Sequence, residues 1–466
     1  MFYLFYIFLF VPLVLCFIVF GTYKLWLLYL YKKGRKREIP SYSLDFYPFV
    51  TIQIPVYNEY NVIERIIKSA TNLNYPKDRF EIQILDDSTD ETKYLIDEIV
   101  EEKRKEGFNI EVIRREKRNG YKAGALKNGL KYAKGEFIAI FDADFIIPPD
   151  FLIKTLPFFK DKNVGLVQAR WGFLNEKENK LAKIQSITLN THFIIEHDSK
   201  FKNGYFFNFN GTAGIWRKEA IIDAGNWQCD TLAEDLDLSV RAYLKGWKFI
   251  FLSDLICFSE LPSDFNSFAT QQFRWTKGTT EVCLKLFKSI IKSNIKLDDK
   301  INILLHLSSP FLYVANFLLF LILWPLSHFS PLLFGILALF FGFANIYNMF
   351  TVDEIIHQNK PLKERISDML YLIFIFSGFS IKGTIAVLEA IFKKKTPFER
   401  TPKKGNQKKK YLVRSKNYLE LLNFVYWIFV VPLAIKLKCF GILPWLLLFA
   451  TGSLYFFYAS NLNLKN

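Results

Sequence analysis

Two stretches decide the fold of the central part of this chain of 466 residues: FEIQILDDS at 80–88 and FIAIFDAD at 137–144. Each is a short apolar run of β-forming residues that ends in acidic side chains. Three further β-rich runs and three helical patterns alternate with them, at 49–54, 110–114 and 165–169 and at 59–70, 89–106 and 122–133 respectively. Such alternation predicts an α/β domain with a mainly parallel sheet that is covered by helices.

Acidic residues follow both strands. In open α/β sheets the ligand lies beyond the carboxyl ends of the strands, so we expect Asp86, Asp87, Asp142 and Asp144 to share one edge. Neighbouring carboxylates repel each other unless a cation or hydrogen-bond donors share the site. An Asp-x-Asp pair suits a hard divalent ion that also holds diphosphate oxygens, such as those of a sugar nucleotide. Either pair alone would fit a turn or a helix cap, but two pairs on one edge favour the metal site.

Two more polar groups follow later in the chain. One carboxylate of Glu234 and Asp235 could take a proton from an attacking hydroxyl, although Thr231 and Glu234 are also spaced for a helix capping box. The stretch QQFRW at 271–275 combines amides, a cation and a flat aromatic ring. This set could hold a diphosphate leaving group and stack a sugar. An Arg and a Trp on a helix beside a membrane would look the same.

Long apolar segments flank the central part. Residues 1–31 are almost wholly apolar and run into a basic cluster at 32–37. About 20 apolar residues cross a bilayer as a helix, and basic clusters stay in the cytosol, which predicts a retained span with the central part cytosolic. After residue 300 the apolar runs return, at 303–326, 331–350, 369–392, 421–435 and 440–458.

The run at 369–392 is treated differently from the others. It contains Lys382 and Glu389, which are costly at bilayer depth, and crossing would place the basic stretch 393–410 outside. We therefore predict an interfacial helix here and five spans in all, with six spans as the alternative. The predicted units are a transmembrane helix (1–31), the cytosolic domain (40–265), interfacial helices (266–300), two spans (301–351), the interfacial helix (366–392), a basic loop (393–415) and two spans (419–461).

Composition restricts partners and compartment. Much of the formal net charge of +16 lies beside the apolar segments, which indicates lipid headgroups rather than nucleic acid as its partner. Five cysteines without paired spacing predict neither a disulfide framework nor a zinc site. Heavy use of Lys, Ile, Phe and Asn indicates an AT-rich bacterial genome and hence the cytoplasmic membrane, with a Golgi membrane as the alternative.

The motifs, in their order along the chain, resemble those of processive family 2 glycosyltransferases, which include cellulose, hyaluronan and chitin synthases. The matching stretches are QIPVYNE (53–59), DDSTD (86–90), KAGAL (122–126), DAD (142–144), ED (234–235) and QxxRW (271–275). VQARW (167–171) and FNGTAGIWR (209–217) resemble the cellulose-synthase-like A and C group, which makes mannan, glucomannan and glucan backbones. The resemblance covers essentially the whole chain, membrane segments included.

The resemblance implies a GT-A domain, with a mixed but mainly parallel sheet, inserted between transmembrane helices. It also implies a role for each matching residue. On the donor side, Asp86 and Asp87 would contact the nucleotide, Lys122 and Arg274 the diphosphate, and Asp142 and Asp144 the sugar diphosphate and Mg²⁺ or Mn²⁺. On the acceptor side, Asp235 would be the general base with Glu234 in support, and the acceptor sugar would lie against Gln271, Trp275 and Trp171.

Two positions depart from the family pattern. Ala233 stands where the family has Thr before Glu-Asp, so a hydroxyl contact is lost. The gating loop of cellulose synthases, Phe-x-Val-Thr-x-Lys, is echoed at 398–403, where Arg400 replaces Val. The sequence therefore does not decide whether this loop closes over the nucleotide.

The function that the resemblance implies is inverting, metal-dependent, processive β-glycosyl transfer, with export of the growing polysaccharide through the membrane helices. GDP-mannose, UDP-glucose and GDP-glucose all fit as donors. Two other functions remain open: addition of a single sugar to a membrane lipid, and transport or conduction by a protein with a nucleotide-binding domain.

Overall fold

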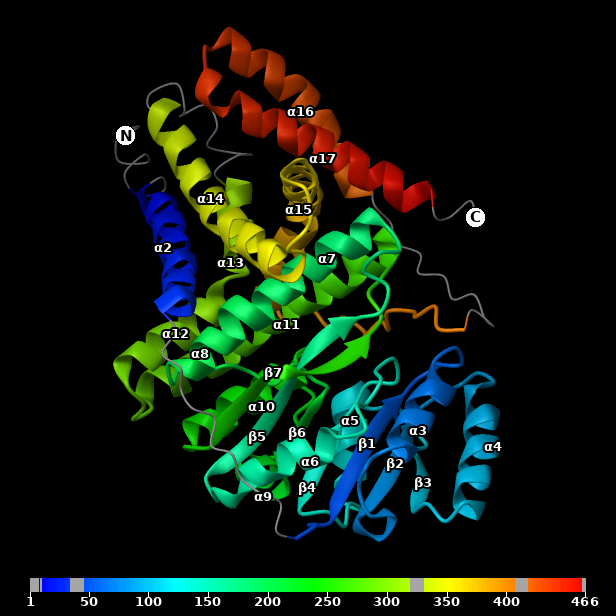
Figure 1. The fold of residues 1–466 in the computed structure, drawn as a ribbon. Helices are drawn as coiled ribbons and strands as arrows, with labels where there is room; N and C mark the ends of the chain where they lie inside the picture. The colour runs from blue at the N-terminus through cyan, green and yellow to red at the C-terminus, as the bar shows by residue number, and fades with distance from the viewer. Residues whose placement is uncertain (1–7, 9–10, 34–45, 319–330, 407–417, 463–466) are drawn as a thin grey trace.

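The computed structural model describes residue 8 and residues 11–33, 46–318, 331–406 and 418–462, without the side chains of 331–343 and 462. An α/β domain occupies the lower part of the view in Figure 1, and long helices from both ends of the chain lie above it. Several predictions fall outside the described residues: the start of the first span, the basic residues 34–37, the segment 319–330 and the end of the basic loop at 407–415.

Seven strands form one sheet in the order β3-β2-β1-β4-β6-β5-β7. Their bounds are β1 Val50–Val56, β2 Phe80–Asp86, β3 Ile110–Arg114, β4 Phe137–Ile140, β5 Val164–Phe173, β6 Gly214–Arg217 and β7 Lys248–Ser259. Only β6 runs antiparallel to its neighbours β4 and β5, and the other pairs are parallel. The predicted mixed, mainly parallel sheet is confirmed, and β6 and β7 are strands that were not predicted.

The register brings the acidic strand ends together. Val50 at the start of β1 pairs with Phe80 of β2 on one side and with Phe137 of β4 on the other. The three strands therefore start level and point the same way. Their polar ends, including Asp86 and the Asp142-Ala143-Asp144 run, meet at one edge of the sheet, as predicted.

Helices cover both faces of the sheet. Alternate residues of a strand point to opposite faces, so Ala139 packs into a core with α3 and α4, whereas Ile138 and Ile140 pack into a second core with α5. The helices of this domain are α3 Ile63–Thr71, η2 Lys77–Arg79, α4 Thr92–Lys105, α5 Tyr121–Gly129, α6 Phe151–Thr155, η3 Leu156–Lys160, α7 Lys180–Thr191, the π-helix η4 His192–Asp198, α8 Ser199–Lys202, α9 Lys218–Asp223 and α10 Glu234–Leu244.

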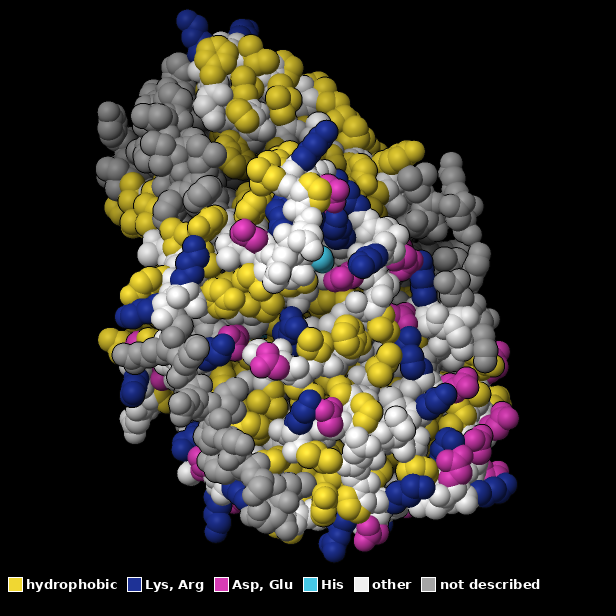
Figure 2. Space-filling model, viewed as in Figure 1, with side chains coloured by type: hydrophobic (Ala, Val, Ile, Leu, Met, Phe, Trp, Pro, Cys, Tyr) yellow, Lys and Arg dark blue, Asp and Glu magenta, His cyan; other side chains and the backbone are white. Residues whose placement is uncertain are grey.

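The remaining helices form the upper layer in Figure 1. They are α2 Val11–Lys33, α11 Phe265–Lys292, α12 Leu297–Ser308, α13 Phe311–Asn316, α14 Pro331–Ile356, α15 Leu362–Ile391, α16 Tyr418–Lys436, η7 Phe440–Ile442 and α17 Leu443–Leu462. Hydrophobic side chains gather over α16 and α17 in Figure 2, whereas charged side chains are scattered over the α/β domain.

Within the described residues, four helical segments are long and apolar enough to cross a membrane: Val11–Lys33, Leu362–Ile391, Tyr418–Lys436 and Phe440–Asn461. These segments indicate a membrane protein. Because α15 is one of them, its length and composition suit the six-span alternative as well as the interfacial helix. The number of spans stays a prediction.

Candidate active site

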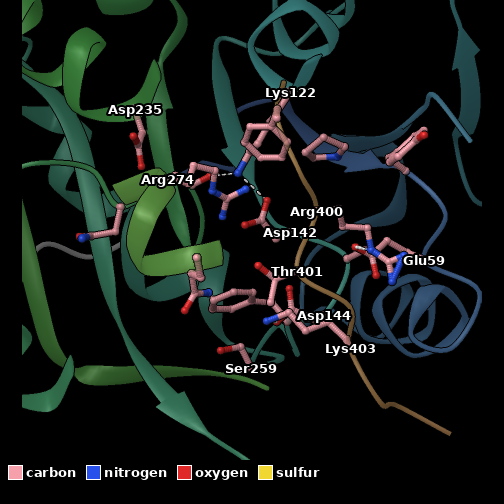
Figure 3. Close-up of a pocket in the computed structure, with 18 of the residues that line it drawn as sticks. Glu59, Lys122, Asp142, Asp144, Asp235, Ser259, Arg274, Arg400, Thr401 and Lys403 are labelled. Atoms are coloured by element: carbon pink, nitrogen blue, oxygen red, sulfur yellow. Dashed lines mark hydrogen bonds and ion pairs between the residues drawn. The ribbon is translucent and has the colours of Figure 1, made fainter. Parts of the chain in front are cut away.

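A cavity of about 190 Å³ lies at the carboxyl edge of the sheet. The ends of β1, β2 and β4, the start of α10 and one face of α11 surround it, and residues 398–403 cross it (Figure 3). Every predicted site residue except Asp86 lines this cavity: Asp87, Lys122, Asp142, Asp144, Trp171, Glu234, Asp235, Gln271, Arg274 and Trp275.

Asp86 has a different position from its neighbour. It is buried at the end of β2, where Arg114 Nε donates to Oδ2 at 2.8 Å and the amide of Ser88 donates to Oδ1 at 2.9 Å. Asp87 faces the cavity, and Arg115 Nε donates to its Oδ1 at 3.0 Å. Asp86 thus holds the turn after β2, and Asp87 is the acid of this pair that a nucleotide could contact.

Lys122, in the first turn of α5, contacts the other acidic strand end. Its Nζ donates to Asp142 Oδ1 and, at 2.9 Å, to the carbonyl of Gly211. Burial alone would lower the pKa of Lys122, but Asp142 and the carboxylates of Glu234 and Asp235 raise it above its ordinary value. Lys122 therefore stays positively charged in the cavity, which suits the binding of a diphosphate.

Asp144 is held by the segment 393–406. Lys403 Nζ lies 2.9 Å from Asp144 Oδ2 and donates to the carbonyl of Glu260 at 2.6 Å. Arg65 donates to the carbonyl of Asp144 at 2.9 Å and to the Glu260 carboxylate at 2.6 Å. The lysine of the gating-like motif therefore occupies the position next to the predicted metal ligand.

Two other residues of this segment also enter the cavity. The ring of Phe398 stacks on Tyr121 at 5.9 Å between centroids and lies 4.2 Å from the Arg274 guanidinium carbon. Arg400 Nε lies 3.0 Å from Glu59 Oε1 (Figure 3). Arg400, the departure from the family motif, thus has an acidic partner in this chain.

Several lining residues were given no role by the sequence analysis, among them Tyr57, Glu59 and Arg118. The Arg118 guanidinium carbon lies 3.4 Å from the centroid of the Tyr57 ring, and burial lowers the pKa of Arg118. Burial raises the pKa of Glu59 to about 8, against the opposing effect of Arg400. Tyr57 and Glu59 directly follow β1, so reading the residues after every strand, and not only the Asp pairs, would have found them.

The carboxylates that follow β4, Asp142 and Asp144, fit a divalent metal ion. In the part of the chain that the structure describes, no three His, Cys, Asp or Glu residues are grouped to hold a metal. Mg²⁺, however, is usually bound through one or two carboxylates together with substrate phosphates and water. Asp142 and Asp144 can supply those carboxylates, so the residues fit an ion that arrives with a sugar diphosphate.

Glu234 and Asp235 form the first turn of α10 on the opposite side of the cavity. Ala233 caps this helix without a side-chain hydrogen bond, so the alternative explanation of this stretch, a capping box of Thr231 and Glu234, is not what the structure shows. The amide of Leu236 donates to Asp235 Oδ1 at 2.8 Å. Burial and the neighbouring Glu234 raise the pKa of Asp235 to about 7, against the opposing effect of Lys122. A carboxylate with a pKa near 7 suits a general base.

The QQFRW stretch lies in α11 and joins two cavities. Arg274 faces the cavity of about 190 Å³ at the carboxyl edge of the sheet, which is called the donor cavity below. Burial there lowers the pKa of its guanidinium despite the nearby carboxylates. Trp275 lines this cavity and also a second one of about 520 Å³ among the long helices. Phe, Tyr and Trp side chains from four other helices (α2, α13, α15 and α17) line the second cavity, among them Phe17, Tyr313, Phe376, Trp445 and Phe449.

Comparison with known proteins gives two matches to family models and several plant relatives. Residues 51–222 match the family described as Glycosyl transferase family 2, and residues 137–350 match Glycosyl transferase family group 2. Glucomannan 4-beta-mannosyltransferase 2 of Arabidopsis thaliana is 47% identical over 252 residues, which are 53% of this chain and 47% of the relative. Glucomannan 4-beta-mannosyltransferase 1 of Oryza sativa subsp. japonica is 39% identical over 301 residues, 63% of this chain and 58% of the relative. This chain spans about half the length of the curated relatives that it matches.

A solved structure supports the predicted fold. A mannosyltransferase of Pyrobaculum calidifontis, in complex with GDP-Man and Mn²⁺, superposes with a TM-score of 0.53 at 18% identity, over 82% of this chain and 100% of that one. At this identity the likeness shows the fold alone. Together with the two family matches, it confirms the predicted GT-A domain. Residues 51–222 of the chain therefore form a glycosyl transferase family 2 domain.

Proposed function

We propose that this protein is a membrane-embedded, inverting β-mannosyltransferase that polymerises a mannan or glucomannan backbone from GDP-mannose. The plant relatives, which are named glucomannan 4-beta-mannosyltransferases, support the choice of sugar. The observation that carries the chemistry is the convergence of Lys122, Asp142, Asp144, Asp235 and Arg274 on one cavity.

The donor side would bind the sugar diphosphate. Asp142 and Asp144 would hold Mg²⁺ or Mn²⁺, which when bound neutralises charge on the diphosphate. Lys122 and Arg274 add two fixed cations around the same group, and Asp87 lies where the nucleotide would enter. These contacts make the nucleoside diphosphate a better leaving group.

The acceptor side would activate the sugar hydroxyl. Asp235 takes the proton of the acceptor hydroxyl while the oxygen of that hydroxyl attacks the anomeric carbon of the donor sugar. The bond between this carbon and the diphosphate oxygen breaks at the same time. Attack from the face opposite the leaving group inverts the configuration. Glu234 keeps the proton affinity of Asp235 high through its adjacent charge.

Trp275 supports a polymer as the product, because its indole lies between the donor cavity and the cavity among the long helices. A chain stacked on Trp275 could extend along the aromatic lining of the second cavity toward the other side of the membrane. The same apolar cavity would also accept a lipid-linked sugar, so single addition to a membrane lipid is the second candidate function.

The proposed orientation places the α/β domain in the cytosol. α2 ends at Lys32 and Lys33, and basic residues at the end of a span favour the cytosolic side. The relatives described above are plant proteins, so the comparisons give no support to the predicted bacterial membrane.

A donor panel tests the proposal. Purified protein is incubated with GDP-mannose, GDP-glucose or UDP-glucose and Mn²⁺, and release of nucleoside diphosphate is followed. We expect release from GDP-mannose and a ladder of products that a β-1,4-mannan hydrolase degrades. A single glycolipid product would favour the second candidate, and failure to release GDP from GDP-mannose would contradict the proposed donor.

A further inference from the structure

One face of α11 contacts both the donor cavity and the segment that carries Asp235. Arg274, Gly278, Glu281 and Lys285 follow one another at intervals of three or four residues, so they lie along the same side of the helix. Arg274 lines the donor cavity. Gly278, Glu281 and Lys285 contact the segment 228–237, which ends in the first turn of α10.

At Gly278 the two segments touch at backbone distance. A Cβ atom on Gly278 would lie 2.9 Å from both the Cβ and the amide nitrogen of Ala233, and 3.0 Å from the carbonyl carbon of Leu232. Side-chain carbons do not normally approach this closely. The contact requires glycine in α11 and leaves room for only a small side chain at Ala233, directly before Glu234.

Two charged residues continue the contact along α11. Glu281 Oε2 accepts a hydrogen bond from the amide of Leu232 at 2.8 Å. Lys285 Nζ donates to Gln228 Oε1 and to Asp230 Oδ1, both at 2.7 Å, and lies 2.9 Å from Asp237 Oδ1. Lys285 of α11 therefore contacts both the loop before α10 and α10 itself.

Asp237 makes this ion pair a buried one. Its side chain has no exposed surface, and Arg241 lies 2.7 Å from its other oxygen. Asp237 is two residues after Asp235 in α10. Breaking a buried ion pair from one side is costly, so Lys285 restrains the turn that carries Asp235 more than a surface lysine would.

A neighbouring residue, next to Glu281 along this side of α11, fixes the helix to α15 and to the segment 393–406. Lys277 is fully buried, lies 3.1 Å from Glu389 of α15 and donates to the carbonyl of Lys394 at 2.6 Å. α11 thus contacts both the segment that crosses the donor cavity and the segment that carries the proposed base. Such a helix can act as a rigid spacer between the two.

We propose that Gly278, Glu281 and Lys285 are positioning residues of the transfer reaction, which set the distance from the Glu234–Asp235 turn to Arg274 and so to the donor. The inference rests on the proposed function, because it takes Asp235 as the base. Misplacement of a reacting group by about 1 Å can cost about 100-fold in rate, whereas binding of the donor alone does not depend on this distance.

Lysine variants of α11 test the proposal. Lys285→Met removes the ion pairs and keeps the apolar stem, Lys285→Arg keeps a cation, and Lys288→Met changes an exposed lysine of the same helix. We expect Lys285→Met to lower kcat about 10-fold or more while GDP binding, measured by calorimetry, changes less than about twofold. Lys285→Arg should recover most of the loss, and Lys288→Met should match the unchanged protein.

A second pair of variants gives an independent decision if Lys285→Met does not fold. Gly278→Ala should lower kcat more than GDP affinity. Adding Ala233→Gly should restore part of the rate, because the Cβ contact disappears while the contact with the amide nitrogen at position 233 remains.

The possible failures are distinguishable. Equal rates for Lys285→Met and Lys288→Met, or a loss of GDP affinity in step with kcat, would overturn the positioning role. Absence of GDP release by the unchanged protein would instead reject the proposed function, and full turnover by Asp235→Asn would reject the base. Melting temperatures of all variants in detergent identify those whose rate falls only because they unfold.

Discussion

The two sides of the cavity treat their carboxylates differently. On the donor side each acid faces a cation from another segment, in the pairs Asp87–Arg115, Asp142–Lys122, Asp144–Lys403 and Glu59–Arg400. On the acceptor side Asp235 lies next to another acid, Glu234, and burial raises its pKa to about 7.

This difference follows the chemistry that each side is proposed to perform. A metal ion can replace the ammonium group of a lysine beside a carboxylate that stays charged, so paired acids suit a site that exchanges cations. An acid whose charged form is disfavoured takes up a proton readily, which suits a base. The arrangement of charges therefore distinguishes the proposed metal-binding edge from the proposed proton-accepting turn within one cavity.

The largest expected effect comes from removing the proposed proton acceptor. Asp235→Asn keeps the shape of the side chain but not its basicity, so we expect kcat to fall by about 10³-fold with GDP binding nearly unchanged. GDP release and calorimetry measure the two quantities. Full turnover by this variant would remove the distinction between the two sides.

The matching change on the donor side should act on metal binding. Asp144→Asn is expected to weaken Mn²⁺ binding in the presence of GDP, measured by electron paramagnetic resonance, and to lower kcat/KM by about 100-fold. Asp78→Asn, which changes an exposed acid with 81% of its side chain accessible, serves as the control. Unchanged Mn²⁺ binding in Asp144→Asn would place the metal elsewhere.

The pH dependence sharpens the comparison further. As the proposed base, Asp235 must be deprotonated to act, so kcat/KM should rise about tenfold per pH unit below a pKa of about 7 and level off above it. The charged groups that face Asp235 are Glu234 of α10, Lys122 of α5 and Arg274 of α11. Lys122 lowers the pKa of Asp235, so Lys122→Met should move the midpoint to higher pH. A profile that is flat from pH 5 to pH 8 would contradict this assignment.

The smallest effect concerns the lysine that faces Asp144. Lys403→Ala removes a cation that competes with the metal, so donor-free protein should bind Mn²⁺ about fivefold more tightly, which corresponds to an ion pair of about 1 kcal/mol. Lys404→Ala, which loses only a surface contact with Glu178, should bind Mn²⁺ as before. Weaker binding in Lys403→Ala would show that Lys403 supports the metal site instead.

Local pattern was sufficient for much of the fold. β1 to β5 are short runs rich in β-branched and aromatic residues, a local composition that predicts strands. β6 has only four residues, and its place between β4 and β5 depends on antiparallel pairing with distant strands. The residues of β7 were not recognised as a strand either, because this edge strand alternates irregularly between buried and exposed positions.

The site divides in the same way. Nearly all of the residues that were predicted from motifs at strand ends and on α11 line one cavity. Asp86 was predicted alongside Asp87, but its partner Arg114 lies on the neighbouring strand, and only the folded sheet brings them together. The contacts of Lys403 and Lys285 likewise join segments that are far apart in the chain, so spacing within a motif does not reveal them.

The lysines at the donor edge also have a consequence for handling the protein. Since Asp142 and Asp144 already have cationic partners in the chain, we expect folding not to depend on a metal ion, unlike the folding of domains built around structural zinc. A chelator such as EDTA should therefore stop sugar transfer without changing the melting temperature. The enzyme could then be purified in a chelating buffer and restored by adding back the ion.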